Sequence, residues 1–369
     1  MKIGIMTGGG DCPGLNAVIR AVAKSLMLQC DAEVIGFERG FLGMIEKKYR
    51  RLEYKDVSGI LTAGGTILGT HNKANPFEYF GANGADVSEQ VLANYEELDL
   101  DGVVAIGGDG TMTIAHRLEQ QGIRFVGVPK TIDNDLMHTD RTFGFDTAVS
   151  IATDAVDRLQ TTGQSHERVM ILETMGRYAG WIALHAGMAG AADIILIPEI
   201  PFEIDEVARV CRERDQRQRF TIIVVGEGAK PRGGEQVVRE TIADSPDPIR
   251  LGGIGNFLRE GLKDRVDSEV RTTVLGHVQR GGTPTAFDRI LSTNFGIYAA
   301  SLVARGTFGE MVALKDGKLT SIALEKVANQ TRYVPVNSLM VRAASAVGTS
   351  FGRSDLEIDL AQPGDELSI

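Results

Sequence analysis

The sequence predicts an α/β protein with two lobes and mainly parallel sheets. Short β-branched runs that end in glycine-rich loops alternate with amphipathic helical patterns, an arrangement typical of right-handed βαβ units. The chain has 369 residues, and at roughly 150 residues per domain it should form about two compact units.

The first lobe begins with a strand expected at residues 2–6, and a helix follows from near Asn16, where apolar residues recur at helical spacing. Two more strands are expected at 102–106 and 125–128. All three strands end in loops that carry glycine or aspartate. Ligands of open α/β sheets bind at the carboxyl ends of the strands, so these loops are expected to line one cleft.

The second lobe follows the same alternation. Its expected strands cover residues 168–173, 193–198, 221–226 and 271–275, and its expected helices cover 175–190, 203–218 and 284–304. We therefore divide the chain into a lobe at 1–150, a lobe at 151–305 and a C-terminal segment at 306–369 that packs back on the lobes. The C-terminal segment carries no motif with an assignable chemistry.

Composition excludes several classes of protein. A net charge of −10 argues against a sequence-independent grip on nucleic acid or on an anionic membrane. The cysteines, Cys12, Cys30 and Cys211, contain no CxxC pair and no even set, which argues against a disulfide scaffold or a cysteine metal site. No apolar run approaches the ~20 residues of a membrane span, so we expect a soluble cytoplasmic protein.

Two glycine loops suit phosphate. The first, GGGDCPG at 8–14, opens a helix, so backbone N–H groups and the helix dipole converge where a phosphate would sit, although a ligand-free turn is the alternative. The second, GGDGT at 107–111, adds the carboxylate of Asp109, which suits a phosphate-bound Mg²⁺. Asp109 is also a common type of helix cap, and that is the alternative here.

The third loop, PKTIDND at 129–135, is the sharpest signal. Its two aspartates are separated by one residue and are able to divide labour. Asp133 would accept a proton from an attacking hydroxyl, while Asp135 would face a metal or orient its partner. A turn rich in Asp and Asn is the alternative reading.

Together these motifs resemble those of the 6-phosphofructokinases of the phosphofructokinase type A family. The likeness runs from Met1 to about Ala304 and includes TGGGDCPGLNAVIR, GGDGT, PKTIDND, SHER, ETMGRYAG and VLGHVQRGG in one order. It implies two Rossmann-like lobes with the active site in the cleft between them, and transfer of a phosphoryl group from Mg-ATP to fructose 6-phosphate in glycolysis. Lobe 1–150 would bind the donor and lobe 151–305 the sugar phosphate, in a homodimer or homotetramer with an active site shared between subunits.

The resemblance also assigns roles to single residues. Asp133 would deprotonate the sugar 1-hydroxyl, Thr131 would touch the sugar or the transferring group, and Arg177 would stabilise charge on that group. Glu227 would accept hydrogen bonds from sugar hydroxyls. Further implied positions are Met175 and Gly176 for the sugar, Arg168, Arg271, His277 and Arg280 for its 6-phosphate, and Gly10, Gly108, Asp109, Gly110 and Thr111 for the donor and its Mg²⁺. Arg168 and Arg271 would reach across from a neighbouring subunit.

The choice of donor depends on two positions that point in opposite directions. Pyrophosphate users carry aspartate at the position of Gly110, where glycine leaves room for the rest of ATP. Lys130 is typical of the pyrophosphate branch, so the chain resembles ATP-using members close to that branch. The family usually has arginine at the position of Asn72, and Lys73 is expected to contact the donor phosphates in its place.

Several alternatives stay open. The donor could be pyrophosphate, and the acceptor could be another ketose phosphate such as sedoheptulose 7-phosphate. A non-catalytic paralogue should have lost Asp109, Asp133 or Arg177, and all are present. A lipid or NAD kinase shares only GGDGT.

The resemblance also bears on regulation. Arg20 and Lys24 persist at the family's regulatory site, but other basic positions of that site are occupied here by Tyr54, Gln160, Gln216 and Gln218. The site therefore loses much of its basic character, and we expect little allosteric control.

Overall fold

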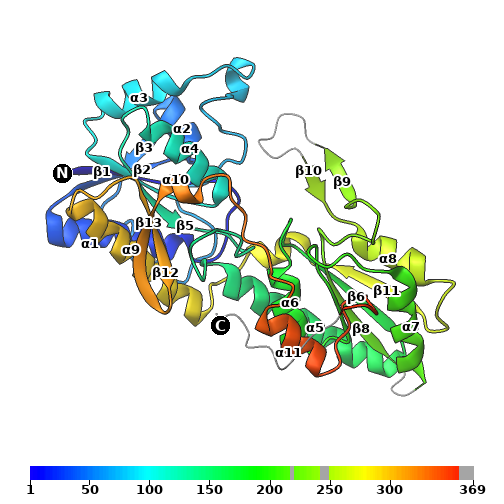
Figure 1. The fold of residues 1–369 in the computed structure, drawn as a ribbon. Coiled ribbons are helices and arrows are strands. Elements are labelled where there is room, and N and C mark those ends of the chain that lie inside the picture. Colours follow the sequence, from blue (N-terminus) through cyan, green and yellow to red (C-terminus); the bar gives the residue numbers. More distant parts are fainter. Residues whose placement is uncertain (217–219, 242–248, 357–369) are drawn as a thin grey trace.

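The computed structural model describes residues 1–216, 220–241 and 249–356, which form two α/β bodies (Figure 1). The larger sheet has the strand order β13-β12-β5-β4-β1-β2-β3, and the smaller has β11-β6-β8-β7. All neighbouring strands of these two sheets are parallel except the pairs β2–β3 and β12–β13. The predicted fold class, with mainly parallel sheets, is therefore confirmed.

Every strand that the sequence predicted is present, with ends shifted by a few residues. The larger sheet consists of β1 (Lys2–Thr7), β2 (Glu33–Phe37), β3 (Tyr49–Arg51), β4 (Gly102–Gly107), β5 (Phe125–Pro129), β12 (Glu310–Lys315) and β13 (Lys318–Ala323). The smaller consists of β6 (Val169–Thr174), β7 (Ile194–Leu196), β8 (Thr221–Gly226) and β11 (Val270–Val274), and a separate hairpin consists of β9 (Val238–Thr241) and β10 (Ile249–Leu251).

The helices cover both sheets. They are α1 (Leu15–Cys30), α2 (Phe41–Glu46), α3 (Ser88–Glu97), α4 (Asp109–Glu119), α5 (Phe145–His166), α6 (Trp181–Ala189), α7 (Ile204–Asp215), α8 (Ile254–Leu262), α9 (Ala286–Ala304), α10 (Leu324–Val327) and α11 (Leu339–Ala346), with 3₁₀ turns η1 (Phe80–Ala82) and η2 (Gly276–Arg280). No helix of the described residues is long and apolar enough to cross a bilayer.

Two predicted helices were too long. The helix expected over 175–190 begins only at Trp181, because Gly176 and Arg177 have φ angles of 143° and 51°, which a right-handed helix does not contain. The helix expected over 203–218 ends at Asp215, and residues 217–218 lie outside the described residues.

The boundaries between the lobes differ from the expected ones. The limit at residue 150 falls inside α5, which links the two sheets. Helix α9, expected in the second lobe, lies against α1 on the larger sheet, where a Cβ on Gly296 would come within 2.6 Å of the Ala21 Cβ. The chain thus returns to its first sheet before residue 305, since α9 leads directly into β12.

The C-terminal segment contacts both bodies. Strands β12 and β13 and helix α10 complete the larger sheet, whereas α11 packs on α6 and Ser350 pairs with Ile194 of β7. Figure 1 shows this path as the orange and red ribbon that crosses from one body to the other. The described part of the segment thus contacts both bodies.

Candidate active site

The two glycine loops meet at Thr111. The loop after β1 is tied to β4, because the Gly8 N–H donates to the Ile106 carbonyl (2.9 Å). A Cβ on Gly107 or on Gly8 would lie 2.2 Å or 2.5 Å from Thr111 Oγ1, so only glycine allows the first turn of α4 to approach this closely. Backbone N–H groups and two helix N-termini are thereby gathered at one edge of the sheet.

Two cationic side chains hold the first glycine loop. Lys130 follows β5, is 4% exposed, and donates from Nζ to the Gly10 carbonyl. Burial lowers the pKa of Lys130, and the neighbouring Arg280 charge lowers this pKa further, while Asp133 and Asp135 raise it. Arg280, from η2 after β11, donates from Nη1 to the Asp11 carbonyl (3.3 Å). The first glycine loop is thus held from both sheets.

Asp133 has a free oxygen. The side chain is 4% exposed, and no described residue donates a hydrogen bond to its buried Oδ1. The loop around it is rigidly tied: the Asp133 N–H donates to Thr131 Oγ1 (3.0 Å), and Asn134, at φ 53°, accepts the Thr142 N–H (3.0 Å) through Oδ1. A buried acceptor without a protein donor is a position where a substrate hydroxyl fits.

Burial disfavours the ionised form of the Asp135 and Asp109 carboxyl groups. Burial, followed by the charge of Asp133, raises the pKa of Asp135. Burial also raises the pKa of Asp109, against the backbone N–H groups of Asn329 (3.1 Å to Oδ1) and Gln330, which lower it. Arg177 lowers both pKa values. A cation bound beside these carboxylates would stabilise their ionised form and lower both pKa values.

This donor set fits Mg²⁺. The described residues contain no group of three or more His, Cys, Asp or Glu side chains that could hold a metal on their own. Mg²⁺ is usually held by one or two carboxylates together with substrate phosphates and water, so Asp109 next to two phosphate-type loops is sufficient protein ligation. No cage of protein ligands is needed.

Glu227 and Arg177 are the counterparts on the smaller sheet. Gly176 (φ 143°) and Arg177 (φ 51°) turn the chain so that the Arg177 N–H donates to Glu227 Oε1 (3.1 Å). A Cβ on Gly228 would lie 1.9 Å from the Arg177 carbonyl, so this turn also requires glycine at 228. Burial, and then the charge of Asp133, raises the pKa of Glu227 to about 7. Charges on the two sheets therefore act on one another.

The residues expected to hold a sugar phosphate are split between two places. His277 and Arg280 lie on η2, beyond the carboxyl end of β11 and on the side of Gly10. Arg168 and Arg271 lie at the amino ends of β6 and β11, where both guanidinium groups contact the carboxylate of Glu269. Within a single chain the structure does not bring the second pair to the carboxylates.

The loop after β3 approaches the first glycine loop. Thr70 donates from Oγ1 to the Gly9 carbonyl, and the Lys73 N–H donates to His71 Nδ1 (3.2 Å). Asn72 is exposed and Lys73 is half-buried. Burial lowers the pKa of His71, and the charges of Arg39 and Lys73 lower it further.

Arg39 was missed from the sequence. It follows β2, a strand that the sequence analysis did not identify, and its φ of 59° and the Gly40 that comes next mark a tight turn. The sequence EVIGFERG at 33–40 carries the same signal as the other loops, a buried β-branched run that ends in a charged residue and glycine.

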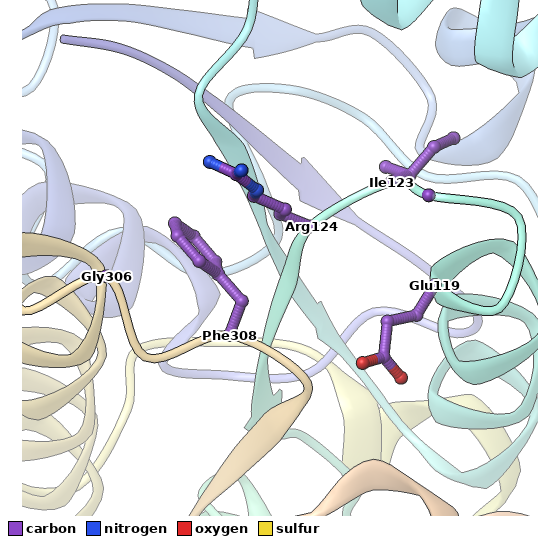
Figure 2. A pocket seen from close by; sticks show the side chains of 6 residues that line it. Glu119, Ile123, Arg124, Gly306 and Phe308 are labelled. Atoms are coloured by element: carbon purple, nitrogen blue, oxygen red, sulfur yellow. The ribbon is translucent and has the colours of Figure 1, made fainter.

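A cavity of about 420 Å³ lies elsewhere, lined by Glu119, Gly122, Ile123, Arg124, Gly306 and Phe308 (Figure 2). These residues precede β5 or follow α9, so the cavity is at the amino end of β5 and away from the glycine loops. Arg124 lies over the Phe308 ring, 5.9 Å from its centroid. None of the candidate site residues lines it.

Comparisons with known proteins agree on one family. A family model described as Phosphofructokinase matches residues 2–303. ATP-dependent 6-phosphofructokinase 2 of Clostridium perfringens is 51% identical over 358 residues, which cover 95% of this chain and 98% of that protein. A pyrophosphate–fructose 6-phosphate 1-phosphotransferase of Amycolatopsis methanolica is 48% identical over 91% of this chain and 96% of its own.

Among solved structures, Pichia pastoris phosphofructokinase in the T-state superposes with a TM-score of 0.77 and 32% identity. The match covers 88% of this chain and 37% of the yeast chain. The family match and the curated relatives span nearly the whole chain, and the loops that carry the predicted motifs lie within them. The chain belongs to the phosphofructokinase family.

Proposed function

We propose that this chain is an ATP-dependent 6-phosphofructokinase, which transfers a phosphoryl group from Mg-ATP to the 1-hydroxyl of fructose 6-phosphate and yields fructose 1,6-bisphosphate. The observation that carries the proposal is the buried, unpartnered Oδ1 of Asp133, in a loop whose charges act on Arg177 and Glu227 of the other sheet. Relatives named ATP-dependent 6-phosphofructokinase, at up to 51% identity, support it.

Each residue has a part in this reaction. Asp133 accepts the proton of the sugar 1-hydroxyl, and Arg177 stabilises the charge on the transferring phosphoryl group. The N–H groups of the glycine loops bind the donor phosphates, and Glu227 accepts hydrogen bonds from the sugar. Asp109 would hold Mg²⁺, which would supply positive charge beside the donor phosphates. Little covalent chemistry is asked of the protein, so alignment of the two bodies sets the rate.

Gly110 supports ATP as the donor. The residue is exposed at the start of α4, and no described atom lies within 4 Å of where its Cβ would be. A side chain is thus tolerated by the fold, and what glycine leaves open is space for the nucleotide. Lys130 and the Amycolatopsis relative support pyrophosphate as the second candidate donor.

A coupled assay of fructose 1,6-bisphosphate formation tests the proposal, with ATP and with pyrophosphate in parallel. We expect activity with Mg-ATP. In Gly110→Asp the ATP KM should rise roughly tenfold to hundredfold, because the carboxylate repels the α-phosphate. Gly110→Ala is the matched control, since it adds bulk without charge. Activity with pyrophosphate and none with ATP would reject ATP as the donor. A third assay replaces fructose 6-phosphate with sedoheptulose 7-phosphate to test the choice of acceptor.

We further propose a cytoplasmic homodimer or homotetramer in which a second copy supplies Arg168 and Arg271 to the sugar 6-phosphate. Both side chains lie at the end of the smaller sheet opposite to Glu227, so one chain alone leaves them outside its own site. Sedimentation of the purified protein tests the assembly, and a monomer that retains full activity would reject it.

A further inference from the structure

One segment touches both halves of the candidate site. We define the strap as residues 328–336, which follow α10 on the larger sheet and precede α11 on the smaller body. Figure 1 shows this stretch passing from the orange α10 to the red α11. The sequence alone assigned no function to the strap.

At its first end the strap is bound to Asp109. The Asn329 N–H donates to Asp109 Oδ1 and to Thr113 Oγ1, each at 3.1 Å, and Asn329 has a φ of 58° that turns the chain toward them. The Gln330 N–H contributes a second backbone donor to the same carboxylate. The carboxylate assigned to Mg²⁺ is thus oriented by backbone of the strap.

In its middle the strap runs along the loop of the catalytic carboxylates. Thr331 pairs with Leu136 in an antiparallel bridge, and the Arg332 N–H donates to the Asp135 carbonyl (2.7 Å). Arg332 also donates from Nη1 to the Asp140 carbonyl (3.0 Å). Backbone movement of the strap therefore moves the 133–135 loop with it.

At its second end the strap is fastened to the N-terminus of α6. The Trp181 indole donates from Nε1 to the Arg332 carbonyl (3.0 Å), and the Arg332 guanidinium lies over the indole ring, 4.5 Å from its centroid. Glu199 Oε1 accepts the Val334 N–H (2.8 Å) and the Gly180 N–H (3.0 Å). Glu199 thus joins the strap to the turn that leads from Arg177.

We propose that the strap is a positioning element for phosphoryl transfer, with Glu199 and Trp181 as positioning residues that hold Asp109 and the 133–135 loop in register with Arg177. The proposal rests on the proposed function, and it deepens it by assigning the alignment of the two bodies to named hydrogen bonds. Neither residue touches the reacting atoms. Both act through the main chain of residues 329–334.

The test compares Glu199→Ala with Glu199→Gln in the full-length protein. The glutamine carbonyl is able to take over both hydrogen bonds of Oε1, whereas alanine removes them. Asp205→Ala, which deletes an exposed carboxylate paired with Arg265 in the same body, is the matched control. Trp181→Phe is a second variant, which keeps an aromatic ring at this position but removes the N–H donor together with part of the indole ring.

In Glu199→Ala we expect hydrogen exchange of peptides covering 328–336 to accelerate at least tenfold, and the emission of Trp181, the single tryptophan of the chain, to shift to the red. Loss of such supporting contacts typically costs about 10–100-fold, so kcat should fall and Mg-AMP-PNP binding should weaken within that range. The KM for fructose 6-phosphate should change less than about twofold. Glu199→Gln and Asp205→Ala should stay near wild type.

Unchanged exchange of the strap in both Glu199→Ala and Trp181→Phe would overturn the proposal, as would a loosened strap with wild-type kcat and nucleotide affinity. If the wild-type chain binds Mg-AMP-PNP but phosphorylates no sugar, the proposed function fails. The strap is then judged by exchange and nucleotide affinity alone, which keeps the two failures distinguishable.

Discussion

The two ends of the smaller sheet present their charges in opposite ways. At the carboxyl ends of the strands, Glu227 is largely buried and accepts the Arg177 N–H, and burial followed by the charge of Asp133 in the other body raises the pKa of Glu227. At the amino ends, Arg168 and Arg271 share one carboxylate, Glu269, and the Arg271 side chain is 57% exposed. At the carboxyl ends the charged group has its partners within the chain, whereas at the amino ends Arg271 is exposed to solvent.

This difference shows how a split site is built. A buried carboxylate needs fixed partners because its charge is costly to bury, so its surroundings must fold with it. Arg271 is exposed and is held by the exposed Glu269, so it loses little when it exchanges that partner for a phosphate, since surface ion pairs are worth about 0–1 kcal/mol. We therefore expect the carboxyl ends of these strands to carry the reacting groups of their own chain, and the arginines at the amino ends to bind the substrate of a neighbouring subunit.

The largest expected effect disrupts the carboxyl end. Asp133→Asn removes the proton acceptor and should lower kcat by about 10²–10⁴-fold, with the sugar KM nearly unchanged. Steady-state kinetics measures both constants. Asp154→Asn, which changes an exposed aspartate paired with Arg158, is the control. A kcat within tenfold of wild type would remove Asp133 from the mechanism.

A pH dependence follows from the burial of Glu227. Its pKa rises from 4.5 to about 7 in the folded chain, so the unfolded chain releases this proton first as pH increases. The free energy of unfolding should therefore fall between pH 4.5 and pH 7, by about 3 kcal/mol from this residue, and level off above pH 7.

Glu227→Gln should flatten that part of the stability curve, because the amide does not titrate. Denaturant unfolding at a series of pH values measures the difference between the two proteins. An identical pH profile for the wild type and the variant would show that Glu227 titrates normally and that the carboxyl end is less organised than its geometry indicates.

The amino end is tested by mixing subunits. Arg271→Ala should raise the KM for fructose 6-phosphate roughly tenfold to hundredfold, the range for loss of a hydrogen bond to a charged group. Mixed with Asp133→Asn, it should give more activity than the two variants assayed separately, because a mixed oligomer has sites with both residues intact. Arg259→Ala, an exposed arginine paired with Glu260, should do neither. No gain on mixing would mean that sites are not shared.

The smallest expected effect concerns regulation. Lys24 Nζ lies 3.9 Å from the centroid of the Tyr54 ring, and the Gln160 side chain donates a hydrogen bond to the Gly190 carbonyl. These side chains therefore already have partners within the chain. Gln218 lies outside the described residues. We expect ADP and phosphoenolpyruvate to change the half-saturating concentration of fructose 6-phosphate less than about twofold, since few cations face them. Sigmoidal kinetics shifted by either ligand would contradict this expectation.

The sequence by itself determined the parallel α/β class and the order of the loops that carry the chemistry. Short β-branched runs predicted β1, β4, β5, β6, β7, β8 and β11, because such runs depend on local propensity and burial pattern. The motifs placed Asp109, Asp133 and Arg177 at strand ends, since a parallel strand ends where its loop begins. The strand β2 and its Arg39 were missed, although this run is as long as β5 and also ends in a charged residue and glycine.

Only the tertiary structure decided which sheet each segment joins. Helix α9 carries the same pattern whichever sheet it covers, and its place on α1 depends on a close approach at Gly296 that no local rule contains. The strap likewise looks like ordinary loop, because its contacts with Asp109, Asp135 and Glu199 are made by backbone N–H groups that every sequence carries. Long-range pairing of that kind is specified by the fold as a whole.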